Sequence, residues 1–264
     1  MSDNKISRRK FLANAAALSS ALAIPSLVMG TGSSCSGSTR QKRDARIIEA
    51  NGRVDVAMIG IGNRGKDVVK EFHDTGLCNV IALCDVDMGA AHTQEVISMF
   101  PGVPQFRDFR NMFDKMADKI DAVMVATPDH SHFPICMELG IHVYVEKPLA
   151  RTFYECELLM QAEQKYGVIT QMGNQGHSEA NYFQFKAWKD AGIIKDVTAV
   201  TAHMNNERRW HSWNPKMVSY PKAEPAPTDM DWNTWLSASH HHDYNRDYHN
   251  GQWRCWYDFG MGAL

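Results

Sequence analysis

The fold is constrained most by one stretch in which an apolar run, a glycine-rich turn, a helical segment and a second apolar run follow one another. The first run spans 54–59 and leads into the glycine-rich turn at 60–65. A helix is expected over 66–75, and the second run, 79–84, ends at Asp85. Strand, tight turn, helix and strand in this order are typical of a βαβ unit, which belongs to a parallel sheet.

The glycine turn and the distant acid together indicate a dinucleotide site. Glycines at such a turn let the backbone approach a pyrophosphate, which lies at the N-terminus of the following helix, where free N–H groups favour anions. Asp85 follows Gly65 by 20 residues, the position at which a carboxylate accepts the ribose hydroxyls of NAD. An acid there also repels the additional phosphate of NADP, so the sequence predicts NAD. The alternative is a purely structural loop.

The segments that follow alternate at the spacing of an α/β fold. Strands are expected over 120–126, 142–146 and 168–172, and helices over 93–99, 109–117, 132–139 and 153–165. This alternation predicts a mostly parallel, doubly wound sheet, whose ligands bind at the carboxyl ends of the strands. Two polar motifs come directly after strands, Thr-Pro-Asp-His-Ser-His at 127–132 and Glu-Lys-Pro at 146–148. Both are therefore expected at the cofactor.

These motifs, in this order, resemble the glucose-fructose oxidoreductase, inositol dehydrogenase and rhizopine-catabolism family, Gfo/Idh/MocA, over 54–264. The resemblance implies an N-terminal Rossmann domain and a C-terminal α/β domain whose open sheet forms contacts in a homodimer or homotetramer. It also implies NAD(P)-linked chemistry at a carbinol carbon of a sugar or polyol. In the family, the lysine of Glu-Lys-Pro lies beside the nicotinamide, which implies a catalytic role for Lys147. The usual asparagine of the Thr-Pro-Asn turn is Asp129 here.

A lysine at that place suits the chemistry, because its amine can exchange a proton with an alcohol or stabilise a developing alkoxide. The alternative for Lys147 is a solvated lysine before a proline turn. The predicted cofactor contacts belong to the glycine turn, the acid and the two strand ends: Gly60, Ile61, Gly62, Asn63, Arg64, Gly65, Asp85, Thr127, Pro128, His132, Glu146 and Lys147.

The Rossmann domain is expected over 54–172, and 173–264 is expected to be the start of the C-terminal α/β domain. A helix over 179–191 carries aromatic residues at helical spacing, which predicts a face packed in a core. A strand over 197–203 is expected to begin the second sheet. The Asp-x-Gly-x-His pattern that the resemblance implies for a catalytic histidine is not present, so this domain is expected to be incomplete.

Most substrate contacts are expected in the aromatic stretch 206–258. Flat aromatic faces cover the apolar faces of sugar rings while polar side chains bond the hydroxyls. The predicted substrate residues are His177, which could equally cap a helix, and Arg209, Trp210 and Trp253. Three adjacent histidines at 240–242 cannot all turn to one ion without strain, so no metal is predicted.

The N-terminal segment 1–34 is interpreted as a targeting signal. Arg8 and Arg9 precede Phe11, and a mildly apolar run follows, which resembles a twin-arginine signal for export of folded proteins across the bacterial inner membrane. The protein is therefore expected in the periplasm, through the twin-arginine machinery, with a membrane tether or a lipid at Cys35 as alternatives. Residues 35–53 are the expected linker. The net charge of −2 shows no basic surplus, so no nucleic-acid partner is predicted.

The leading hypothesis is an exported, NAD-dependent oxidoreductase acting on a sugar, glycoside or polyol. A second is an NAD-dependent glycosidase that oxidises the sugar transiently, eliminates the leaving group and takes the hydride back. Export favours it, because the periplasm has no free NAD pool and such an enzyme recycles its cofactor. The third hypothesis is a non-catalytic sugar-binding protein with a relict nucleotide fold.

Overall fold

The computed structural model describes residues 52–137, 140–203, 219–249 and 251–262. The predicted targeting segment, most of the linker, Arg209 and Trp210 lie outside the described residues. Within the described ranges no helix is both long enough and apolar enough to cross a membrane.

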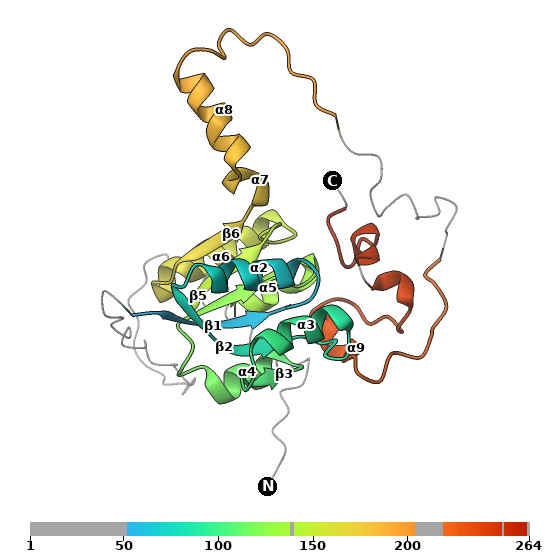
Figure 1. Cartoon of the computed structure of the whole chain (residues 1–264). Coiled ribbons are helices and arrows are strands. Elements are labelled where there is room, and N and C mark those ends of the chain that lie inside the picture. Colours follow the sequence, from blue (N-terminus) through green and yellow to red (C-terminus); the bar gives the residue numbers. More distant parts are fainter. Residues whose placement is uncertain (1–51, 138–139, 204–218, 250, 263–264) are drawn as a thin grey trace, which may run out of the picture.

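A single parallel sheet organises the first 120 or so described residues in the order β3-β2-β1-β4-β5-β6 (Figure 1). Its strands are β1 (Val54–Ile59), β2 (Cys78–Cys84), β3 (Gln105–Phe106), β4 (Ala122–Val125), β5 (His142–Glu146) and β6 (Thr170–Gly173). The chain moves outward from β1 to β3, then returns to β4 beside β1. This reversal confirms the predicted doubly wound Rossmann fold. The short strand β3 was not predicted, because two residues carry no periodicity.

Helices cover both faces of the sheet. They are α2 (Arg64–Asp74), α3 (Ala91–Met99), α4 (Phe109–Met116), α5 (Asp129–Met137) and α6 (Phe153–Tyr166). Alternate residues of β1 point to opposite faces. Met58 packs in one hydrophobic cluster with Val68 of α2 and Val96 of α3, whereas Ile59 packs in the other with Met112 and Ile135 of α4 and α5. The sheet is therefore buried on both sides, as a parallel sheet requires.

The second predicted domain is not present as a sheet among the described residues. After β6 come α7 (Gln175–Ser178) and α8 (Ala180–Asp190), which extend away from the sheet in Figure 1. The predicted strand over 197–203 is wrong: these residues form no strand, and Val200 is 84% exposed. A strand needs a neighbour to pair its backbone N–H and C=O groups, and no described segment forms a strand pairing with this one.

The predicted core face of α8 is also wrong within the described residues. Phe183, Phe185 and Trp188 are all exposed, and no residue of α8 is buried. Helical spacing of apolar residues predicts which side chains share a face, but burial depends on a surface that packs against it. No described element supplies that surface.

The described residues beyond 218 pack back against the Rossmann sheet. They contain α9 (Trp232–Leu236) and the 3-10 helices η2 (Arg246–Tyr248) and η3 (Gln252–Cys255). We call residues 219–249 and 251–262 the return segment. Its aromatic cluster contains Trp235, Tyr248, Trp253 and Phe259. His130 at the start of α5 anchors it, because the His130 ring lies 4.8 Å from that of Trp235.

Candidate active site

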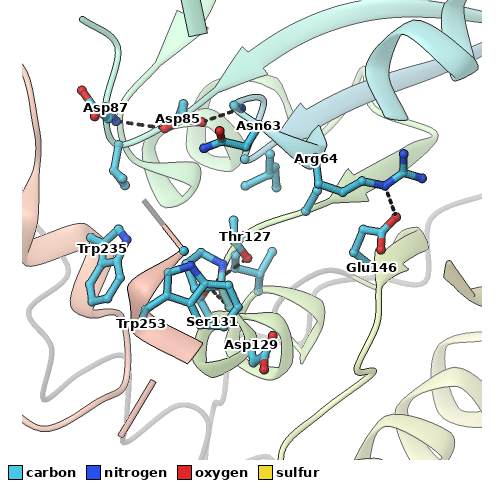
Figure 2. Close-up of a pocket in the computed structure, with 18 of the residues that line it drawn as sticks. Asn63, Arg64, Asp85, Asp87, Thr127, Asp129, Ser131, Glu146, Trp235 and Trp253 are labelled. Atoms are coloured by element: carbon cyan, nitrogen blue, oxygen red, sulfur yellow. Dashed lines mark hydrogen bonds and ion pairs between the residues drawn. The ribbon is translucent and has the colours of Figure 1, made fainter. Parts of the chain in front are cut away.

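A cavity of about 470 Å³ lies at the carboxyl ends of the central strands. One wall contains the ends of β1, β2 and β5 and the turn after β4, and the other is formed by the return segment. Figure 2 shows Asp85 and Asp87 at one end of the cavity, and Arg64 with Glu146 at another. This is the edge of the sheet at which the two polar motifs were predicted to meet.

The glycine turn allows the backbone to close tightly on this cavity. A Cβ at Gly65 would lie 1.8 Å from the carbonyl oxygen of Gly60, and a Cβ at Gly60 would lie 2.8 Å from the backbone of Ala126. Gly60 also has a φ of +77°, a conformation that favours glycine. Neither position can carry a side chain, so both glycines are required by the turn itself.

Helix α2 begins at the cavity, two residues earlier than predicted. Its N-cap residue Asn63 makes no capping hydrogen bond with its side chain. The first N–H groups of a helix have no partner within the helix, and its dipole favours an anion there. Together with the closed glycine turn, this end of α2 has the shape and charge that a pyrophosphate needs.

Asp85 holds the glycine turn in place. Its Oδ2 accepts hydrogen bonds from the backbone N–H groups of Ile61 (2.9 Å) and Gly62 (3.2 Å), and its Oδ1 accepts one from Asp87 (2.9 Å). Burial raises the pKa of Asp85 above its ordinary value, although the three backbone donors oppose this shift. Asp85 lines the cavity, as predicted, while its hydrogen bonds within the chain all go to the backbone.

An ion pair joins the glycine turn to the Glu-Lys-Pro motif. Arg64 Nε lies 3.1 Å from Glu146 Oε1, and the Glu146 side chain is only 6% exposed. Burial alone would lower the pKa of Arg64, but the hydrogen bonds and negative charges of Glu71 and Glu146 raise it. Glu146 is therefore a paired carboxylate that positions the end of β5, and the next residue, Lys147, faces the cavity.

His132 does not line the cavity, which corrects its assignment as a cofactor contact. Its ring is buried, with Nδ1 2.6 Å from the carbonyl oxygen of Pro148 and Nε2 2.8 Å from that of Thr127. The last residue of the motif falls within α5, on the side that faces the neighbouring loops. His132 thus ties the two motifs together rather than contacting a ligand.

Lys147 and Asp129 lie at the same part of the cavity. Asp129 Oδ2 accepts a hydrogen bond from the N–H of Met261 at 3.0 Å. Burial raises the pKa of Asp129, while that hydrogen bond and the positive charges of His132, Arg254 and Lys147 act in the opposite direction. Lys147 forms no ion pair within 4.0 Å with any described residue, so its amine is left for a ligand.

The return segment supplies an aromatic and cationic wall. Trp253 and Trp235 line the cavity, and the Arg254 guanidinium lies 4.0 Å from the ring centroid of Trp253. Of the predicted substrate residues, Trp253 therefore lies in the cavity. His177 does not: it is exposed on α7, with its ring 4.1 Å from that of Tyr182. The sequence around His177 predicted a position near the start of a helix. Helix α7 does begin there, but it leads away from the cavity and takes His177 with it.

Residues 54–174 match the model of an oxidoreductase family with an NAD-binding Rossmann fold, Gfo/Idh/MocA. Over these residues the chain is similar to the NAD-binding domain of that family. The glycine turn and the uncapped start of α2 fit that cofactor, since both leave backbone close to the cavity. Within the described residues, no group of three or more His, Cys, Asp or Glu side chains is placed to hold a metal ion.

The chain is similar to two curated proteins with different names. The chain is 31% identical over 197 residues to inositol 2-dehydrogenase 1 of Saccharopolyspora erythraea, covering 70% of this chain and 55% of that protein. It is 28% identical over 254 residues to a glycosyl hydrolase family 109 protein of Shewanella pealeana, covering 79% and 51%. The chain spans about half the length of the curated relatives it matches.

Among solved structures, the chain is similar to a myo-inositol 2-dehydrogenase from Lactobacillus plantarum. The two share 22% sequence identity and a TM-score of 0.48, over 55% of this chain and 43% of that one.

Nine of the cofactor residues predicted from the sequence line the cavity: Gly60, Gly62, Asn63, Arg64, Asp85, Thr127, Pro128, Glu146 and Lys147. Ile61 is instead buried in the core, and Gly65 lies beneath the turn. The sequence did not indicate Asp87, Trp235, His249 or Arg254, which line the cavity as well. Only the aromatic composition of 206–258 hinted at the last three, because no spacing rule connects residues so far from the glycine turn.

Proposed function

We propose that the protein is an NAD-dependent oxidoreductase that transfers a hydride between nicotinamide and a carbinol carbon of a sugar or polyol. The observation that carries the proposal is that Lys147, Asp129 and Trp253 line the same cavity as the glycine turn. A cofactor held at the turn and a substrate held at the aromatic wall would thus meet beside the free amine of Lys147. The similarity to an inositol 2-dehydrogenase supports an alcohol as the substrate.

When NAD is bound, its nicotinamide ring supplies the hydride acceptor. The chain contributes a proton site at Lys147 Nζ, which can hold the developing alkoxide or take the hydroxyl proton of the substrate. Asp129 places a negative charge near that amine and is itself held by the N–H of Met261. Glu146, paired with Arg64, keeps the end of β5 in position beneath Lys147.

The aromatic wall suits a carbohydrate or cyclic polyol. The rings of Trp253 and Trp235 offer flat apolar surfaces for the C–H face of a sugar. Arg254 and Gln175 supply hydrogen-bond donors beside them. Such a mixture favours ring-shaped alcohols over linear aliphatic ones.

A glycosidase that works through transient oxidation is the second candidate. Similarity to a glycosyl hydrolase family 109 protein across 79% of this chain favours it. The same Lys147 amine would serve both reactions, because each begins with removal of a hydroxyl proton as hydride leaves the carbon. In the glycosidase, the hydride returns to the sugar and no NADH accumulates.

One assay separates the candidates. The purified protein is incubated with NAD and a panel of cyclic polyols and sugars, and in parallel with aryl glycosides whose released phenol is coloured. NADH formation from a polyol or sugar supports the oxidoreductase. Release of phenol without net NADH supports the glycosidase. Binding of sugars without either reaction would contradict both and leave a non-catalytic sugar-binding protein.

We further propose that the protein is exported through the twin-arginine machinery and that it assembles as a homodimer or homotetramer. The Arg8-Arg9 pair before an apolar run supports export. The exposed aromatic residues of α8 support assembly, since apolar surface of this kind is usually covered by a protein partner. Size-exclusion chromatography with light scattering would test the assembly, and a monomer would contradict it.

A further inference from the structure

Two adjacent strands bring a carboxylate and an amine to neighbouring positions in the cavity. Strands β4 and β5 are parallel, and Val125 pairs with Val145 at their carboxyl ends. Asp129 follows Val125 by four residues and Lys147 follows Val145 by two, so both leave the sheet at the same edge. Both residues line the cavity. The fold therefore places an acid close to the amine that the proposed reaction uses.

The Asp129 carboxylate is held in position by one of its oxygens. Its Oδ2 accepts a hydrogen bond from the Met261 N–H at 3.0 Å, whereas no described residue donates a hydrogen bond to its Oδ1. Asp129 is only 6% exposed, and Figure 2 shows it on the same side of the cavity as Trp253. A carboxylate fixed through one oxygen can accept a proton at the other without losing its position.

The charges around Asp129 come from three elements. His132 on α5, Lys147 after β5 and Arg254 on η3 are positive charges that lower the pKa of Asp129, as does the Met261 N–H. Burial outweighs them, so the pKa of Asp129 is raised above its ordinary value. A carboxyl group in such surroundings holds a proton more readily than a solvated aspartate does.

The Lys147 amine is able to turn between two partners. It forms no ion pair within 4.0 Å with any residue that the structure describes. Its four-carbon stem is flexible, and its donors rotate. An amine locked against a carboxylate could not also contact a substrate hydroxyl, so the looser arrangement of Lys147 and Asp129 suits passage of a proton from one to the other.

We propose that Asp129 is a second proton site, which takes from Lys147 the proton that the substrate hydroxyl releases. The inference rests on the hydride transfer proposed above. As the carbinol C–H bond gives its electron pair to bound NAD, the substrate O–H bond breaks and an N–H bond forms at Lys147 Nζ. An N–H bond of that amine then breaks, and an O–H bond forms at Asp129 Oδ1. The alcohol is oxidised to a carbonyl, NAD is reduced to NADH, and Lys147 ends the step with the protons it had at the start.

Asp129→Asn tests the proton transfer, because the amide oxygen can still accept the Met261 N–H. On a polyol or sugar that the wild type oxidises, we expect kcat to fall by about 100-fold, with KM, NAD affinity and melting temperature close to those of the wild type. The wild-type kcat should fall as the pH drops through the raised pKa of Asp129, because a protonated carboxyl group accepts no second proton. The variant should lack this pH dependence.

Two controls separate proton transfer from a structural role. Imidazole in the buffer should restore part of the turnover of Asp129→Asn and leave that of the wild type unchanged, because a small base replaces the missing proton acceptor. Asp118→Asn, at an exposed position outside the cavity, should behave as the wild type. A kcat of Asp129→Asn close to that of the wild type, or an unchanged pH profile, overturns the proposal.

A second measurement needs no substrate. Nuclear magnetic resonance follows the titration of isotope-labelled aspartate carboxyl groups, and the signal missing from Asp129→Glu identifies Asp129. Lys147→Met should raise the pKa of Asp129 further, because a positive charge that lowers it is lost. Lys119→Met, at an exposed position outside the cavity, should not change it.

An Asp129 titration that Lys147→Met leaves unchanged overturns the proposal, since the two groups would not interact. Failure of the proposed function gives a different result. In that case the wild type would oxidise no alcohol, while the Asp129 titration would still respond to Lys147→Met.

Discussion

At the scale of single residues, His130 shows how a buried polar group can hold two parts of the chain together. Its Nε2 lies 2.8 Å from the carbonyl oxygen of Trp235, and its Nδ1 lies 3.2 Å from that of Phe259. Burial lowers the pKa of His130 from 6.5 to about 4, although the two carbonyls oppose this shift. The folded protein therefore keeps this ring neutral at pH values where an unfolded chain would protonate it.

That difference makes stability depend on pH. Between pH 6.5 and 4, the unfolded state binds a proton at His130 and the folded state does not, so the free energy of unfolding falls as the pH falls. The expected contribution is about 3 kcal/mol over that range. His130→Leu should be less stable than wild type at pH 7, and the gap should narrow toward pH 4. Denaturant unfolding between pH 7 and 4 measures the difference in the free energy of unfolding between wild type and His130→Leu, with the exposed His203→Leu as control. A difference that stays constant across this pH range would contradict this role of His130.

Lys147 is the residue on which turnover depends in the proposed mechanism. Lys147→Met keeps the length and apolar stem of the side chain but removes the amine. We expect kcat to fall by about 100-fold or more, as for loss of a positioned proton-transfer group, while NAD affinity changes only a few-fold. Steady-state kinetics on a substrate found with the proposed polyol and sugar panel, together with calorimetric NAD binding, would measure both effects. Turnover close to wild type would exclude Lys147 as the proton site.

Residue types and spacing predicted where polar groups gather, but not what each one does. Asp85 was expected to contact ribose, and in the structure it accepts backbone hydrogen bonds from Ile61 and Gly62 of the glycine turn and from Asp87. His132 was expected at the cofactor and instead bridges two carbonyl oxygens. In both cases the partner is a backbone group brought close by the fold, and side-chain patterns carry no information about that.

At the scale of elements, the turn between β1 and α2 requires glycine for steric reasons. Gly65→Ala would place a methyl group 1.8 Å from the Gly60 carbonyl oxygen, so the turn must open. We expect a loss of about 1–3 kcal/mol in stability, typical of overpacking, together with weakened NAD binding. Gly176→Ala is the control, because nothing lies within 4 Å of the added methyl group. Thermal unfolding and NAD titration compare the stability and the NAD affinity of the two variants. Equal stability and equal NAD affinity in Gly65→Ala and Gly176→Ala would contradict the steric requirement for glycine at position 65.

The strands and helices of the sheet were predictable because each carries its own signal. Parallel strands buried on both faces appear as short apolar runs, and α6 begins at a capping box formed by Thr152 and Glu155 and ends at Gly167. The strand expected over 197–203 had a similar apolar pattern but no partner strand among the described residues. Local sequence thus predicts that an element can form, whereas pairing decides whether it does.

At the scale of the whole molecule, the return segment completes the cavity. Several contacts anchor it to the Rossmann domain. Among them, Arg151 donates hydrogen bonds to the carbonyl oxygens of Tyr257 and Asp258, Asp129 accepts one from Met261, and the His130 ring nitrogens lie near the carbonyl oxygens of Trp235 and Phe259. None of these contacts follows from a motif. The cofactor half of the site could therefore be predicted from the sequence, whereas most of the substrate half could not.

Export is a property of the whole chain that the N-terminal arginines predict. Replacing both Arg8 and Arg9 by lysine keeps the charge of the segment but removes the paired guanidinium groups. We expect the protein to remain inside the cell, while Lys5→Arg and Lys10→Arg together leave export unchanged. Fractionation of the native host followed by immunoblotting measures this. Periplasmic accumulation of the double-lysine variant would contradict a twin-arginine route.

In the proposed mechanism, the cavity at the carboxyl ends of the sheet holds NAD for hydride transfer. The most direct test is to denature the purified protein and identify the released nucleotide by mass spectrometry, after incubation with an equal mixture of NAD and NADP and removal of the unbound excess. We expect about one NAD or NADH per chain and little NADP. Release of NADP in place of NAD, or of no nucleotide at all, would contradict it.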